Sequence, residues 1–122
     1  LSDKNEKKNF FVKSDSNDSS FIKFSDYDEL KKLDSYRLDT IPEIIILKKI
    51  HLIKIDAEGF EPEVIKGCKN ILQKVEFITI DCGPERNNKP TSKNVIILLK
   101  KKFKIVNRNK TRGTILFKNR FI

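Results

Sequence analysis

The sequence predicts an α/β fold, in which helices flank a largely parallel sheet that ends in an antiparallel pair of strands. Apolar runs typical of strands alternate with helical patterns from residue 50 onward, which favours parallel strands joined by helices. The last two strands, predicted at 103–106 and 114–117, are separated only by the loop 107–113. This loop is too short for a crossover helix, so these two strands must be antiparallel.

Length and composition exclude several classes of protein. The 122 residues suffice for one domain with one core, and 38% hydrophobic residues in clustered runs exclude a chain disordered throughout. No apolar stretch approaches the roughly 20 residues of a membrane span, and the polar start lacks a signal-peptide pattern. Cys68 and Cys82 have neither metal-binding nor disulfide-framework spacing. We therefore expect a cytoplasmic protein without a metal site.

The formal net charge of +9 arises from 26 basic and 17 acidic residues. Lysines are spread along the chain, and the densest basic stretch is 100–112. A solvated basic face is the favoured interpretation, and a basic module that binds a polyanion is the alternative. Nucleic acid is not the expected partner, because aromatic residues do not recur among these lysines, where Phe103 stands alone.

Residues 1–49 are predicted to form an irregular connecting region with short elements. Brief strands are expected at 10–12 and 21–24, and a short helix at about 26–33, with Asp26 as its N-cap. A second helix is predicted to begin after Asp39 or Thr40 as cap, with Pro42 in its first turn, and to end near residue 49.

Residues 50–122 are predicted to form a β-α-β-α-β-β core. The first strand covers 51–55, and the helix after it begins at 61–63, where two carboxylates and a proline suit a helix N-terminus. Apolar residues recur at helical spacing from Val64 to Leu72. The next strand is expected at 75–80, followed by a helix over about 91–101 with Ser92 as candidate cap.

The turn after the first core strand carries three carboxylates, on Asp56, Glu58 and Glu61. Ligands of open α/β sheets bind outside the carboxyl ends of the strands. Carboxylates at that edge can accept hydrogen bonds from hydroxyls or an ammonium, bind a cation, or act as a general base. They can equally well do no more than complement the helix dipole. Asp81, at the end of the second core strand, is predicted at the same edge.

Residues 52–67, which read LIKIDAEGFEPEVIKG, resemble the signature block of FkbM-type S-adenosylmethionine-dependent methyltransferases. Weaker similarities flank this block. Leu38-Asp39 resembles the family's Thr-Leu-Asp element, although Arg37 stands where the Thr is usual, and Ser19-Ser20-Phe21 resembles its Ser-Ser-Leu. Residues 1–12 resemble the stretch after the family's third strand.

The resemblance implies methyl transfer from S-adenosylmethionine to a hydroxyl of a sugar or another small metabolite. By resemblance, Asp56 is the catalytic carboxylate and faces both cofactor and acceptor. Glu58 and Glu61, together with Asp81 at the neighbouring strand end, are then the candidate acceptor-binding residues. Nothing in the resemblance or the spacing calls for a metal ion.

The resemblance also implies a partial domain, which supplies strands four to seven of a Rossmann-like methyltransferase sheet. The family's glycine-rich cofactor loop would precede Leu1, and the four glycines of this chain form no G-x-G pattern. We therefore expect the isolated chain to bind S-adenosylmethionine only weakly. The open edge of strand 51–56 is expected to pair with the missing N-terminal half or with a second copy. A non-catalytic remnant or assembly piece is the alternative function.

Overall fold

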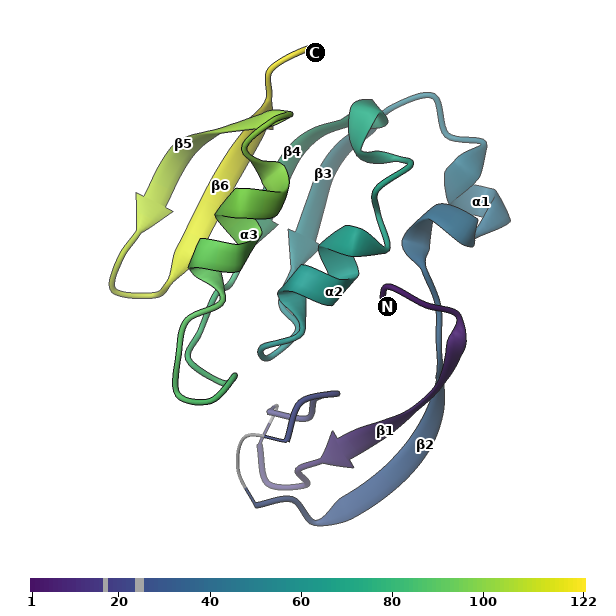
Figure 1. Ribbon diagram of the computed structural model, residues 1–122, viewed down its shortest axis with the longest axis vertical. Coiled ribbons are helices and arrows are strands. Elements are labelled where there is room, and N and C mark those ends of the chain that lie inside the picture. The colour runs from purple at the N-terminus through teal and green to yellow at the C-terminus, as the bar shows by residue number, and fades with distance from the viewer. Residues whose placement is uncertain (17, 24–25) are drawn as a thin grey trace.

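The computed structural model describes residues 1–16, 18–23 and 26–122. Its main feature is a four-stranded sheet in the order β3-β4-β6-β5 (Figure 1). The first two of these strands are parallel, and β6 runs antiparallel to both of its neighbours. The predicted α/β class and its closing antiparallel pair are confirmed. The four strands are β3 (Ile50–Ile55), β4 (Val75–Ile80), β5 (Phe103–Asn109) and β6 (Thr114–Asn119).

Two helices, α2 (Glu61–Lys66) and α3 (Ser92–Leu99), lie over one face of this sheet (Figure 1). A 3-10 turn, η2 (Leu72–Lys74), leads from α2 toward β4. The strand register places Ile55, Ile80 and Ile115 in one row across the sheet, and all three are buried. This row therefore forms part of the core beneath the helices.

The core belongs to the second part of the chain. Among the described residues, every buried hydrophobic side chain lies between Ile55 and Phe117. The side chains buried before Ile55 are polar and small or paired, namely Ser2, Ser20, Ser35 and Asp39. Burial of apolar area is the main stabilising term in folding, so the sheet and its two helices carry most of the stability.

The N-terminal segment forms a separate hairpin, in which β1 (Glu6–Val12) pairs antiparallel with β2 (Glu29–Ser35) (Figure 1). The helix expected at about 26–33 is therefore wrong. Its sequence signal was local, whereas β2 is stabilised by main-chain pairing with a strand that lies far away along the chain. The strand expected at 21–24 is not formed over 21–23, and Phe24 lies outside the described residues. Next to it, Ser20 forms an isolated bridge with Phe11.

The helix expected after residue 40 is short. A 3-10 turn, η1 (Leu38–Thr40), precedes α1 (Pro42–Ile45), which ends at Ile45 and not near 49. Pro42 occupies the first turn, as predicted. The expected caps Asp39 and Thr40 are wrong, because Ile41 is the N-cap and no side chain caps the helix.

Asp39 has a different function in the fold. Its carboxylate accepts two hydrogen bonds from the Arg37 guanidinium, at 2.9 and 2.8 Å, and a third from the Asn70 N–H at 3.0 Å. These partners hold the pKa of Asp39 below its usual value despite the opposing effect of burial. Asp39 thus joins the N-terminal segment to the region after α2. Gly67 helps this contact, since a β carbon there would overlap the Ser2 carbonyl oxygen.

The described part of the chain contains no helix long and apolar enough to cross a membrane. Both cysteines are free and buried.

Candidate active site

The candidate site is built on the tight turn between β3 and α2. The Phe60 N–H donates to the Ala57 carbonyl oxygen at 3.1 Å, which closes the turn. Glu58 and Gly59 both have positive φ, +48° and +91°. A β carbon on Gly59 would also lie 3.2 Å from the Arg86 backbone nitrogen. The turn therefore requires a glycine at position 59.

Glu61 holds this turn together from inside. Its side chain is 1% exposed, and its Oε1 accepts hydrogen bonds from the N–H groups of Ala57 at 3.2 Å and Gly59 at 2.9 Å. Its Oε2 accepts one from the Thr91 hydroxyl at 2.7 Å. Glu61 thus links the turn to the start of α3. Its contact with an acceptor stays a prediction, whereas its positioning of the turn is a role that the sequence interpretation missed.

The same hydrogen bond explains why the Thr91 side chain does not cap α3. The helix begins at Ser92, and Thr91 occupies the N-cap position without a side-chain bond to the helix backbone. The Thr91 hydroxyl is used for Glu61 instead. The expected cap at Ser92 and the helix bounds of 91–101 are corrected to Thr91 and Ser92–Leu99.

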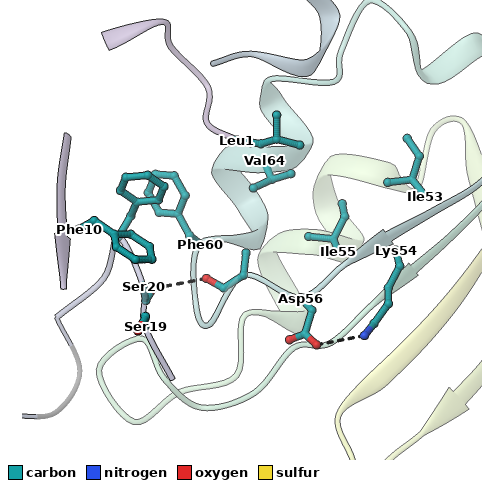
Figure 2. A pocket seen from close by; sticks show the side chains of 12 residues that line it. Leu1, Phe10, Ser19, Ser20, Ile53, Lys54, Ile55, Asp56, Phe60 and Val64 are labelled. Atoms are coloured by element: carbon teal, nitrogen blue, oxygen red, sulfur yellow. Dashed lines mark hydrogen bonds and ion pairs between the residues drawn. The ribbon is translucent and has the colours of Figure 1, made fainter. Parts of the chain in front are cut away.

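Asp56 lies at the mouth of the turn. Its side chain is 44% exposed and pairs with Lys54 Nζ at 3.2 Å, a partner that the sequence did not suggest (Figure 2). Both residues line a cavity of about 320 Å³ between β3 and the N-terminal segment. The other lining residues are mostly apolar and include Leu1, Phe10, Phe21, Ile53, Phe60 and Val64.

The N-terminal segment closes this cavity on the side facing away from β3. The Ser20 hydroxyl donates to the Glu58 carbonyl oxygen at 2.8 Å, and it also lies 3.4 Å from the Ala57 carbonyl oxygen (Figure 2). The Phe21 ring packs against both the Phe10 and Phe60 rings, with centroids 5.0 and 5.3 Å apart. The segment thereby fixes the position of the turn 56–61, called the acidic turn below, and forms one wall of the cavity.

Glu58 is suited to exchange a proton near neutral pH. Partial burial, followed by the negative charges of Glu85 and Asp56, raises its pKa from 4.5 to about 7. A general base works best when its pKa is close to the working pH. The sequence placed Glu58 at the site but gave no sign of this property, because Glu85 comes from the loop after β4 and meets Glu58 only in the fold.

Asp81 joins the turn from the neighbouring strand end. Its N–H donates to the Ile55 carbonyl oxygen at 3.0 Å, which continues the pairing of β3 with β4. The structure therefore brings Asp81 and the Asp56 turn to one edge of the sheet, as predicted. Next to them, Arg86 forms a two-pronged ion pair with Glu63, at 3.1 and 2.7 Å, and so fixes the loop after β4 against α2.

These residues can be compared with what a metal ion or S-adenosylmethionine would need. The described residues contain no cluster of three or more His, Cys, Asp or Glu side chains arranged to hold a metal ion. The sulfonium and ammonium groups of the cofactor are cations, which suits Asp56 beside its cavity. No glycine-rich strand-to-helix loop is present in the sequence.

A sequence model of the methyltransferase FkbM domain matches residues 2–104. This chain belongs to the FkbM methyltransferase family. The family resemblance drawn from residues 52–67 is thus confirmed, and the matched range includes the whole acidic turn of this FkbM chain. No curated protein and no solved structure matched the chain.

Proposed function

We propose that this FkbM chain takes part in methyl transfer from S-adenosylmethionine to a hydroxyl oxygen of a sugar or another small hydroxylated metabolite. The observation that carries the proposal is the turn 56–61, which presents Asp56 and Glu58 at the carboxyl end of a parallel strand pair. This is the edge at which open α/β sheets bind their ligands. Family membership supports methyl transfer as the reaction.

The residues of the turn have distinct proposed tasks. When bound, S-adenosylmethionine supplies a methyl group that its sulfonium has already activated. The chain must then orient the acceptor hydroxyl and take up one proton. We assign orientation of the hydroxyl to Asp56, with Asp81 as a second hydrogen-bond acceptor. Either Asp56 or Glu58 receives the proton, and the pKa of about 7 favours Glu58 for that task at neutral pH.

The open edge of β3 is the proposed docking place for the segment that would complete the cofactor site. In the described sheet, β3 is an outer strand, and Leu52 on it is 55% exposed. An exposed edge strand with apolar side chains is prone to pair with another strand. We propose that an N-terminal half of the domain pairs here, with self-association as the alternative. The free cysteines favour a reducing compartment such as the cytoplasm.

The test is a methyl-transfer assay on the full-length protein, including any coding sequence that precedes Leu1 in its gene. Transfer of a radiolabelled methyl group to a panel of sugars and sugar derivatives is measured for the wild type and for Asp56→Asn. We expect Asp56→Asn to lower the transfer rate by about 10²-fold or more. Asp34→Asn, on the exposed hairpin strand β2, is the matched control and keeps the wild-type rate.

Two results would contradict the proposal. Turnover at the wild-type rate in a folded Asp56→Asn protein would remove the assignment of Asp56. A folded wild type without transfer to any acceptor of the panel would favour a non-catalytic remnant or assembly piece.

A further inference from the structure

A second cavity, of about 420 Å³, lies at the same edge of the sheet as the acidic turn. It is enclosed by the loop that follows β4, the segment before α3 and the turn that joins β5 to β6. Its size is within the range of small-molecule sites. The lining residues are Cys82, Gly83, Pro84, Pro90, Ser92, Arg108, Lys110, Thr111, Arg112 and Gly113.

The charge of this lining is entirely positive. Arg108, Lys110 and Arg112 contribute three cations, and no aspartate or glutamate is among the lining residues. Within the described residues, none of the three forms an ion pair, whereas Lys54 and Arg86 near the acidic turn both do. Three cations around one hollow repel one another, so an anion bound there would be stabilised, although the carboxylates of Asp81 and Glu85 lie close behind Gly113 and Gly83.

The cavity adjoins the candidate active site through Asp81 and the hairpin turn. Gly113, at φ +71°, lies close to the end of β4: a β carbon on it would be 3.3 Å from the Cys82 carbonyl oxygen and 3.7 Å from Asp81 Oδ1. The Asp81 N–H in turn donates a hydrogen bond to the carbonyl oxygen of Ile55, the residue just before Asp56. Acidic and basic regions therefore lie next to each other along one edge of the sheet.

The start of α3 agrees with this distribution of charge. Ser92, the first residue of α3, lines the cavity, and the first turn of this helix contains no acidic residue. By contrast, the first turn of α2 contains Glu61 and Glu63. The positive end of the α3 dipole thus adds to the field of the three side chains.

We propose that this cavity binds a phosphate ester group of the acceptor, while the acceptor's hydroxyl lies at the acidic turn. The acceptor would then be a phosphorylated sugar or polyol. Phosphate is favoured because it carries up to two negative charges and several acceptor oxygens, which suit a pair of arginines and a lysine. The placement of the reacting hydroxyl at the acidic turn rests on the proposed function, whereas the binding of an anion in the cavity does not depend on it.

The test measures binding to the chain without cofactor, using glucose 6-phosphate and glucose as probes in an NMR titration of the ¹⁵N-labelled protein. We expect glucose 6-phosphate to shift the amide signals of Gly83, Arg108 and Gly113, and glucose to leave them in place. Arg108→Gln/Arg112→Gln should weaken binding about tenfold or more, because two charge-assisted hydrogen bonds are lost. Lys101→Gln/Lys104→Gln, on the same basic stretch but outside the cavity, removes equal charge and should retain the affinity.

Three outcomes would overturn the inference: no shift at the cavity amides, equal weakening by the two double variants, or equal shifts with glucose. A short single-stranded oligonucleotide that binds more tightly than glucose 6-phosphate, with shifts spread over residues 100–112, would also overturn it in favour of a polyanion surface. Failure of the proposed function is distinguishable, since binding confined to the cavity in a protein without methyl transfer would leave the anion site intact.

Discussion

The two charged regions at the edge of the sheet are built in opposite ways. The acidic turn at 56–61 is stabilised from within, because the buried Glu61 carboxylate accepts three hydrogen bonds. In the basic cavity, the side chains of Arg108, Lys110 and Arg112 are exposed and have no ion-pair partner among the described residues. The acidic turn is thus part of the folded framework, whereas the basic side chains are free to serve a ligand. Substitution of the buried Glu61 should therefore lower stability, whereas substitution of the basic side chains should lower ligand binding.

The largest effect on stability is expected for Glu61→Ala. The substitution leaves the N–H groups of Ala57 and Gly59 and the Thr91 hydroxyl without their acceptor in a buried place. We expect it to lower the free energy of unfolding by about 3 kcal/mol, measured by urea denaturation. Arg112→Ala in the basic cavity should change it by less than about 0.5 kcal/mol. Equal effects of the two substitutions would contradict the distinction between the regions.

A smaller effect is expected at the two glycines that shape these regions. Gly59→Ala should cost about 2 kcal/mol, because φ is +91° and the new β carbon would press on the Arg86 backbone at 3.2 Å. Gly113→Ala should cost about 1 kcal/mol, since φ is +71°, nearer the left-handed helical region. Urea denaturation of both variants checks the order, and a larger cost at Gly113 would show that the basic side is the more strained.

The smallest effect is a pH dependence from Glu58. Its pKa of about 7 in the folded protein lies above its ordinary value of 4.5, so the folded state resists its ionisation. The protonated form is present in both states at low pH, and stability is lost as pH rises from about 4.5 through 7. Glu58→Gln does not ionise and escapes this loss. We expect it to be more stable than the wild type at about pH 8, by roughly 1 kcal/mol after solvent screening.

At about pH 4 the two proteins should be equally stable, and paired denaturation series at both pH values make the comparison. A constant difference across this range would mean that Glu58 does not titrate as described.

The sequence predicted the sheet better than it predicted the N-terminal segment. The core strands and α2 carry apolar patterns of their own, and the short 107–113 loop dictated the antiparallel ending. The strand β2 has no such pattern: Leu30 and Leu33 on it are 48% and 38% exposed, and its pairing depends on β1. Nonlocal pairing of this kind leaves no local signal, which is why a helix was predicted there.

The same limit applies to the candidate site. The positions of Asp56 and Asp81 followed from the ends of the two apolar runs 51–55 and 75–80, which coincide with the ends of β3 and β4. The role of Glu61 in the turn depends on Thr91, and the raised pKa of Glu58 depends on Glu85, both distant in sequence. Likewise, the sequence shows that the stretch 100–112 is basic. That it lines a cavity together with the loop after β4 depends on the β5–β6 hairpin and could not be predicted.

The most direct measurement compares steady-state kinetics of the full-length protein, including any coding sequence before Leu1, with a phosphorylated and an unphosphorylated sugar acceptor. Asp56→Asn should lower kcat by about 10²-fold or more for both acceptors, because its carboxylate acts on the reacting hydroxyl. Arg108→Gln/Arg112→Gln should raise KM for the phosphorylated acceptor about tenfold or more. A wild-type kcat in Asp56→Asn, in a protein that still folds, would contradict the assignment of the chemistry to the acidic turn.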